Sequence, residues 1–392
     1  MAKMSENAQK PRIRFKGFSD AWEQRKLGEF SSLITKGTTP LDKNNSGIVN
    51  FVKIESIDES SGDITITQRI SIDEHNGYLR RSQLKENDIL FSIAGTLGRV
   101  TSVKSSILPA NTNQALAIIR LKDGCLDYVK TYLKGKAVAE FIKKNPTIGA
   151  QPNLSLEQVA NLEIAIPSVS EQVKIGNYFE KLDNLITLHQ RKYDKLVAVK
   201  KSLLEKMFPA DGETVPKIRF KGFSDAWEQR KLGEVSESYS GGTPSVGIKE
   251  YYGGQIPFIR SAEINSETTE LFLTEEGLKN SSARLVAVGD ILYALYGATS
   301  GEVGRARLKG AINQAILAIK PNKDYDSEYL AQWLRKSKHR IIETYLQGGQ
   351  GNLSGAIVKE LSADFPSLKE QKTIGDFFRQ LDNLITLHQR QL

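Results

Sequence analysis

The stretch LDNLITLHQR occupies residues 182–191 and recurs without substitution at residues 381–390. Both copies extend toward the N-terminus, as PSVSEQVKIGNYFEK from residue 167 and PSLKEQKTIGDFFRQ from residue 366, and the two 25-residue windows agree at 17 positions. Copies this similar predict one structural element that the chain uses twice.

Apolar residues in both copies recur at alternating steps of four and three, the heptad spacing of a helix that packs along one stripe. We expect the first helix to run from residue 170 to residue 207, roughly 57 Å at ~1.5 Å per residue. Lys200 stands where the stripe needs another apolar residue. The stripe comprises Ile175, Phe179, Leu182, Ile186, His189, Tyr193, Leu196, Leu203 and Met207 in the first copy, and Ile374, Phe378, Leu381, Ile385 and His388 in the second.

Each copy opens with a proline and then Ser-x-x-Glu, at Ser168 to Glu171 and Ser367 to Glu370. This pattern predicts a capping box, in which the hydroxyl and the carboxylate satisfy unpaired N–H groups of the first turn. Pro209 cannot continue the first helix and is expected to end it.

Two heptad stripes in one chain favour packing of the helices on each other, because a strict heptad specifies a helical partner. The alternative is that each helix packs on its own domain. The first helix continues through Lys192 to Phe208, whereas the second stops at Leu392, which leaves the partner of residues 192–207 open.

The duplication is larger than the helix. IRFKGFSDAWEQRKLGE occurs at residues 13–29 and again at residues 218–234, and looser matches link this head to the helix in both halves. The two halves are therefore expected to share one fold of head, globular domain and helix. The looser matches pair GTTP at 37–40 with GGTP at 241–244, DILF at 88–91 with DILY at 290–293, NQA at 113–115 with 313–315, and NLS at 153–155 with 352–354.

Short segments rich in β-branched residues predict strands, and segments with apolar residues at helical spacing predict helices. The strands are expected at residues 48–54, 63–70, 88–93 and 115–121, and the helices at 127–143 and 327–345. The fold class is thus α+β. The expected domains, in chain order, are an N-terminal head at 1–19, a first globular domain at 20–166, a helix at 167–208, a linker with the repeated head at 209–224, a second domain at 225–365 and a second helix at 366–392. The linker stretch is FPADGETVP at 208–216.

Residues 41–87 and 245–289 share little beyond hydrophobic pattern, although the heads and helices around them are nearly identical. Identical supports that hold unlike surfaces are expected when two modules dock on one symmetric assembly yet recognise different things. An enzyme with a single active site would not need this arrangement.

The chain has 392 residues, 54 Lys and Arg against 46 Asp and Glu, a net charge of +8 and a pI near 9.2. This balance favours a polyanionic partner, although a merely basic soluble protein would show it too. A single cysteine, Cys125, excludes a disulfide framework and a thiolate metal cluster. Without a signal core or a long apolar run, the chain is expected to be cytoplasmic.

The motifs of several enzyme classes are missing. The glycine-rich turns at 95–99 and 297–304 lack the Lys-Ser/Thr of a P-loop, and Asn145-Pro146-Thr147 does not match the amino-methyltransferase motif. The sequence has no Pro-Asp pair to begin a PD-(D/E)xK nuclease site, and its four histidines predict no metal cluster. Asp88 and Asp290 begin strands, where we expect structural roles.

Loops of both domains carry the side chains that contact phosphates or base edges. Any one of these residues could equally be a solvated loop position, and the hypothesis rests on the set. The candidates are Lys36, Thr38, Thr39, Lys43, Asn44, Arg80 and Arg81 in the first half, and Ser240, Thr243, Ser245, Lys249, Tyr251, Arg260 and Arg305 in the second.

The ordered series of motifs closely resembles the specificity subunit of type I restriction–modification systems. The series comprises WEQRKLGE at 22–29, GGTPS at 241–245 with YYGG at 251–254, GDIL at 289–292, NLS at 352–354, and PS at 366–367 before EQ at 370–371 and Ile374. The resemblance covers essentially the whole chain, and the full series occurring twice makes it specific.

This resemblance implies two target-recognition domains separated by two long antiparallel coiled-coil helices, with an internal pseudo-twofold repeat. Each domain would read one half of a split, asymmetric DNA site, with half-sites about one helical turn, on the order of 34 Å, apart. Two methyltransferase subunits using S-adenosylmethionine, and two translocase/nuclease subunits using ATP and Mg²⁺, would supply the chemistry, so that this chain binds no cofactor. The alternatives are a stand-alone DNA-modifying enzyme with unrecognised motifs and a coiled-coil scaffold that binds no DNA.

Overall fold

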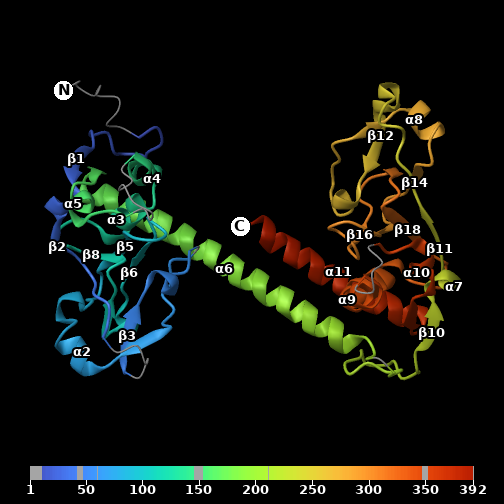
Figure 1. Cartoon of the computed structure of the whole chain (residues 1–392), viewed down its shortest axis with the longest axis horizontal. Helices are drawn as coiled ribbons and strands as arrows, with labels where there is room; N and C mark the ends of the chain where they lie inside the picture. Colours follow the sequence, from blue (N-terminus) through green and yellow to red (C-terminus); the bar gives the residue numbers. More distant parts are fainter. Residues whose placement is uncertain are drawn as a thin grey trace. The chain divides into compact units, whose positions relative to one another are not determined.

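The computed structural model describes residues 11–41, 47–59, 61–144, 153–210, 212–346 and 352–391 (Figure 1). The chain divides into two compact units, Met1–His189 and Gln190–Leu392. Each unit combines sheets with short helices and contains part of a long helix, so the predicted α+β class is confirmed.

Unit 1 is built on a four-stranded antiparallel sheet in the order β2-β8-β5-β6, where β2 is Ser31–Lys36, β8 Leu116–Leu121, β5 Ile89–Ser92 and β6 Val100–Ser102. A second sheet has the order β4-β3-β7, with β4 Gln68–Ile70, β3 Val49–Val52 and β7 Ala110–Thr112, and β3 is parallel to β7. A third pair joins β1 (Glu23–Lys26) of the head to β9 (Glu163–Ile166). Its helices are α1 (Leu27–Phe30), α2 (Ile72–Asn76), α3 (Leu126–Leu133), α4 (Lys136–Lys144) and α5 (Leu156–Ala160), with short 3₁₀ turns η2 (Ile54–Ser56), η3 (Arg80–Ser82) and η4 (Ser105–Ile107).

Unit 2 repeats this plan, which confirms the predicted duplication of the fold. Its sheets are β10-β19, β11-β18-β15-β16 and β13-β12-β17-β14, and β12 is again parallel to β17. The strands are β10 (Glu228–Lys231), β11 (Ser236–Ser240), β12 (Tyr252–Ile259), β13 (Phe272–Leu273), β14 (Arg284–Val286), β15 (Ile291–Ala294), β16 (Val303–Arg305), β17 (Gly310–Ile312), β18 (Ile316–Pro321) and β19 (Ser362–Phe365). The helical elements are α7 (Leu232–Val235), η5 (Lys249–Tyr251), η6 (Ser261–Glu263), α8 (Glu275–Lys279), α9 (Ser327–Leu346), α10 (Gly355–Glu360) and α11 (Leu368–Arg390).

The same tyrosine anchors the core of each unit. Tyr128 on α3 and Tyr329 on α9 are buried, and their hydroxyls donate to the carbonyls of Ala165 and Asp364 in the strand before each long helix. Burial raises the pKa of both phenols. Each ring also packs edge-on against the tryptophan of its head, Trp22 or Trp227, so the head, the domain and the start of the helix share one core.

Most predicted elements lie where the sequence placed them, with two differences. The expected strand at 63–70 shortens to β4, and the expected helix at 127–143 is broken into α3 and α4 around Gly135. Glycine has a high entropic cost in a helix, and the Gly135 N–H turns back to the carbonyl of Tyr132 at 2.9 Å. Its counterpart α9 has no glycine and continues unbroken.

The long helix α6 spans Val169–Met207 without interruption and begins within one residue of the predicted start. The N–H of Glu171 donates to the Ser168 hydroxyl at 3.4 Å, and the N–H of Glu370 donates to the Ser367 hydroxyl at 3.4 Å. The carboxylate half of the predicted capping box is wrong, because Glu171 and Glu370 bind arginines of the heads instead.

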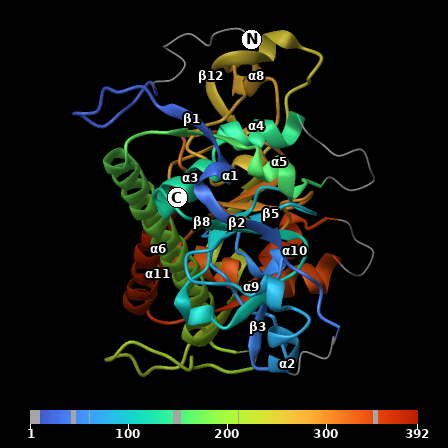
Figure 2. The same cartoon turned by 90° about the vertical axis from the view of Figure 1, so that its left-hand side faces the viewer.

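Within unit 2 the C-terminal part of α6 lies antiparallel beside α11 (Figure 1 and Figure 2). Leu196, Leu203 and Leu204 pack on a core that contains Phe378 and Leu381. The helices therefore pack on each other, as predicted, and residues 192–207 have a partner. The alternative also holds in part, because α11 packs on α9 of its own domain.

Phe208, the first residue after α6, is buried. It is 1% exposed, and its ring stacks on Phe378 and contacts Trp227 and Tyr329. The helix thus ends inside the core of unit 2. In the described part of the chain, no helix combines the length and apolar character needed to cross a membrane.

Candidate nucleic-acid interface

Each head is fastened to its long helix by a bidentate ion pair. In unit 1 the Nε and Nη2 atoms of Arg14 donate to the Glu171 carboxylate at 2.6 and 2.7 Å. In unit 2 Arg219 donates to Glu370 at 2.7 Å through both nitrogens. The glutamates are 0% and 1% exposed, so the identical heads have a common function in satisfying a buried charge.

A glutamine and a glycine then hold the domain against the same helix. The side chains of Gln172 and Gln371 accept the N–H of Cys125 and Asp326, and they donate to the carbonyls of Pro167 and Pro366. One turn later the backbones approach closely: a Cβ on Gly375 would lie 3.0 Å from the Tyr329 nitrogen. Both halves therefore position their loops through the same contacts.

The aspartate of the repeated LDN triplet makes an ion pair in both units. Lys134 lies 3.2 Å from Asp183, and at the equivalent place Arg335 lies 3.4 Å from Asp382. In unit 2 Lys200 of α6 also donates to Asp382 at 2.5 Å. Burial lowers the pKa of Lys200, and the Asp382 charge opposes that shift. A lysine therefore interrupts the heptad because it pairs with the neighbouring helix.

The first predicted DNA-binding loop of unit 1 starts at the end of β2. Lys36 and Thr39 are exposed, and the Thr38 N–H donates to the carbonyl of Thr112 at 3.0 Å. Thr39 Oγ1 donates to Gln114 Oε1 at 2.5 Å. The loop is thus held against the turn between β7 and β8, whereas Lys43 and Asn44 lie outside the described residues.

Unit 2 holds its loop in the same way. Ser240 ends β11, and Thr243 Oγ1 donates to Gln314 Oε1 at 2.5 Å. Ser245 and Lys249 are exposed, and Tyr251 is half-buried in η5. Gln114 and Gln314 were missed as candidates, although the repeated Asn-Gln-Ala triplet was the signal for them.

A cavity of about 400 Å³ lies beside the unit 1 loop. It is lined by Thr39, Pro40, Phe51, Lys53, Thr67, Gln68 and Asn113. Lys53 and Gln68 were not predicted, because they lie on or next to short strands rather than in a recognisable loop. Arg80 and Arg81 are exposed on η3, and neither makes an ion pair with any other described residue.

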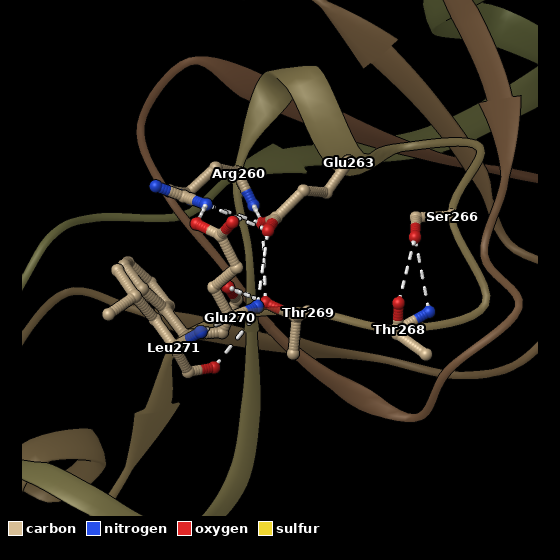
Figure 3. A network of polar contacts seen from close by, with 8 residues as sticks. Arg260, Glu263, Ser266, Thr268, Thr269, Glu270 and Leu271 are labelled. Atoms are coloured by element: carbon tan, nitrogen blue, oxygen red, sulfur yellow. Dashed lines mark hydrogen bonds and ion pairs between the residues drawn. The ribbon is translucent and has the colours of Figure 1, made fainter. Parts of the chain in front are cut away.

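Arg260 is occupied by an ion-pair network within its own domain. Its guanidinium donates to Glu263 at 2.8 Å and to Glu270 at 2.7 Å, and Figure 3 shows these side chains pointing toward one another. Burial tends to raise the pKa of Glu263, but hydrogen bonds from the Arg260 side chain and backbone and the Glu270 N–H outweigh it and lower the pKa to about 2. The same contacts raise the pKa of Arg260.

Arg305 is likewise engaged. It donates to the carbonyl of Gly289 at 2.8 Å and to the Glu328 carboxylate of α9 at 2.8 Å. A cavity of about 510 Å³ lies beside it, and its lining includes Arg335 and Asp382 of the helices. These contacts connect Arg305 to the helical framework of unit 2.

Asp88 and Asp290 have structural partners. Asp88 is 0% exposed and accepts both Nε and Nη2 of Arg120 at 2.7 Å, while Asp290 pairs with Lys320 at 3.1 Å. Among the described residues, no group of three or more His, Cys, Asp or Glu side chains is arranged to hold a metal ion.

The predicted packing stripe differs in exposure between the copies. Ile374, Phe378 and Leu381 are buried, and Ile385 and His388 are half-buried. In the first copy Phe179 and Ile186 are 42% and 43% exposed, and Ile175, Leu182 and His189 are half-buried. Identical sequence thus occupies unlike surroundings.

The model of the type I restriction modification DNA specificity domain matches residues 19–198 and again residues 224–392. The chain belongs to this family of type I DNA specificity subunits. It is 24% identical to the putative type I restriction enzyme MjaX specificity subunit of Methanocaldococcus jannaschii over 94% of this chain and 89% of that one. The MjaVIII specificity subunit of the same organism is 23% identical over 94% and 88%.

The fold agrees with a solved specificity subunit. The crystal structure of the type I restriction-modification S subunit from M. genitalium aligns with a TM-score of 0.63 at 16% identity, covering 97% of this chain and 94% of that one. The chain is the DNA specificity subunit of a type I restriction–modification system, and its part in that system is recognition rather than catalysis.

Proposed function

We propose that each globular domain of this specificity subunit reads one half of a split, asymmetric DNA target. The observation that carries the proposal is the contrast between nearly identical frameworks and unlike segments at 41–87 and 245–289. The frameworks repeat down to single contacts, such as Arg14–Glu171 and Arg219–Glu370. Two domains that are held alike but carry different surfaces suit two different half-sites.

The loops at the ends of β2 and β11, together with η3 and η5, are the proposed DNA-contact surface. They offer the hydroxyl, amide and cationic groups that bind phosphates and base edges. Arg260 and Arg305 are left out of this proposed surface, because their guanidinium groups already bind carboxylates of their own unit. The residues retained are Lys36, Thr38, Thr39, Lys43, Asn44, Arg80, Arg81, Ser240, Thr243, Ser245, Lys249 and Tyr251.

We further propose that two methyltransferase subunits dock on the two copies of the repeated helix. Leu185 and Leu188 are 51% and 46% exposed, and their counterparts Leu384 and Leu387 are 48% and 50% exposed. Equivalent apolar side chains that stay exposed in both copies suit two copies of one partner. In this proposal the methyltransferases use S-adenosylmethionine, two translocase subunits use ATP and Mg²⁺, and the complex works on DNA in the cytoplasm.

The proposed reading function is tested by comparing the assembled complex on its target and on random duplexes at one salt concentration. A preference for the target is expected, whereas contacts with the backbone alone would give salt-dependent binding without preference. The purified chain alone should transfer no methyl group to DNA. Methyl transfer without a second subunit would overturn the assignment to recognition.

The docking proposal is tested with Leu185→Asp and Leu384→Asp, singly and together. A carboxylate at an apolar contact should weaken co-purification of the methyltransferase, with one copy lost per single variant. Lys181→Ala, an exposed change on the same helix, is the control. If the double variant still co-purifies with two methyltransferase subunits, the docking surface does not include these leucines.

A further inference from the structure

The turns between β7 and β8 and between β17 and β18 have the same geometry in both units. Each turn is Asn-Gln-Ala, and the Asn side chain accepts the alanine N–H at 3.2 Å in both. The alanine carbonyl then accepts the N–H of Ile93 or Leu295 next to the central strand. Gln114 and Gln314 are therefore presented at the tip of a turn anchored in the core.

The loop that follows β2 or β11 closes over this turn. A Cβ on Gly37 would lie 1.9 Å from the carbonyl oxygen of Thr112, and one on Gly241 would lie 1.8 Å from that of Ile312. Only glycine allows such an approach. The loop threonine, Thr39 or Thr243, is thereby placed to donate its hydroxyl to the glutamine Oε1 at 2.5 Å.

This contact fixes the direction of an exposed amide. Both the threonine and the glutamine are exposed in each unit, where a neutral hydrogen bond has little stabilising effect of its own. No hydrogen bond within the described ranges uses the Nε2 donors of Gln114 or Gln314. Each turn thus offers an oriented pair of N–H donors to an acceptor outside the chain.

We propose that Gln114 and Gln314 donate these N–H groups to phosphate oxygens of the DNA backbone, one in each half-site, and so set the register of the two domains. The inference rests on the proposed function, since it assigns a role within the same surface. Phosphate contacts position a protein without carrying sequence information. An element that is the same in both halves cannot distinguish unlike half-sites, whereas it suits a backbone that is chemically the same in both.

Base reading fits the turn less well. An amide that reads adenine uses its oxygen and its nitrogen together, and here a threonine hydroxyl already occupies the oxygen in both units. Specific contacts are left to residues 41–87 and 245–289. The two kinds of contact are therefore divided between repeated and divergent parts of each domain.

The experiment measures binding of the assembled complex to its target duplex and to a random duplex at fixed salt. Gln114→Ala and Gln314→Ala should each weaken binding to both duplexes by the same factor, about ten-fold, and the double variant by about a hundred-fold. The ratio of the two affinities should stay at the wild-type value. Gln24→Ala and Gln229→Ala, which alter exposed glutamines at equivalent positions of the heads, are matched controls that should bind as wild type.

Thr39→Ser and Thr39→Val test the orientation. Thr39→Ser keeps the hydroxyl and should bind DNA as wild type does. Thr39→Val removes the hydroxyl that orients the Gln114 amide, so it should weaken binding, but by less than Gln114→Ala does. A methylphosphonate at the contacted phosphate should make Gln114→Ala silent on that duplex.

Weaker binding of the glutamine variants to the target duplex alone would show that these residues read bases. Wild-type affinity in both variants would show that neither glutamine contacts the DNA. Either result overturns the inference. A wild-type complex that does not prefer its target would instead refute the proposed function itself.

Discussion

Glu370 is a buried carboxylate at 1% exposure, and Arg219 is its ion-pair partner at 2.7 Å. Removing one member of such a pair leaves an uncompensated charge, so Arg219→Ala should destabilise unit 2 by about 3 kcal/mol. Chemical denaturation measures the change. The double variant Arg219→Met/Glu370→Leu should cost less than Arg219→Ala alone, because no buried charge remains. A larger loss in the double variant would contradict this account.

Glu263 ties the stability of unit 2 to pH. Its pKa of about 2 lies below the usual value of about 4.5 for a glutamate. Its contribution to the stability of unit 2 is therefore present above the unfolded pKa and is lost as the pH falls from about 4.5 to about 2. Glu263→Gln should lower the free energy of unfolding by ~1–2 kcal/mol at pH 7 and should weaken the dependence of stability on pH below about 4.5. Denaturant midpoints of the wild type and the variant, measured between pH 2 and pH 7, test this prediction. Glu276→Gln is the exposed control, and an unchanged slope in Glu263→Gln would refute the network.

Residue types were readable from the sequence, but their partners were not. The exception in the heptad at Lys200 was visible, yet its cause depends on Asp382, 182 positions later in the chain. Glu171 and Glu370 fit a capping box by spacing, and only the folded head shows that an arginine takes the carboxylate. Arg260 matches the chemistry of a DNA-reading residue, but only the folded chain brings Glu263 and Glu270 to its guanidinium group.

At the scale of elements, Gly375 allows α11 to approach α9. A Cβ there would lie 2.7 Å from Asp326 Oδ1 and 3.0 Å from the Tyr329 nitrogen. Gly375→Ala should therefore destabilise unit 2 by ~1–3 kcal/mol from overpacking, although alanine favours a helix by roughly 1 kcal/mol. Thermal unfolding of the variant shows whether the substitution stabilises or destabilises unit 2. Lys372→Ala, exposed one turn earlier, should be neutral, and stabilisation by Gly375→Ala would contradict the close contact.

Element boundaries followed from local signals where those signals were strong. The heptad and the two prolines predicted α6 to within a residue at its start, because periodicity and helix stops are properties of the local sequence. The difference in exposure between the two copies of the repeated helix did not follow from the sequence. Phe179 and Phe378 occupy the same repeat position, yet one is 42% exposed and the other is buried, because burial depends on what the rest of the chain places beside them.

At the scale of the whole molecule, the duplication predicts that recognition is modular. Residues 41–87 include β3, β4, α2 and η3 and rest on a framework that is repeated in the other half. Exchanging this segment for that of a subunit with another specificity should change one half of the target and leave the other half unchanged. Methylated adenines mapped in DNA from cells that carry the complete system report both halves at once.

The reciprocal exchange of residues 245–289 is the matched control, and it should alter the other half alone. Residues 41–87 meet their framework through buried contacts, such as the hydrogen bond from Thr112 Oγ1 to the Val52 carbonyl at 2.8 Å. A change in both halves after a single exchange would show that the two domains do not read independently. In that case the repeated framework would serve assembly alone, and the division between positioning and reading residues would fail with it.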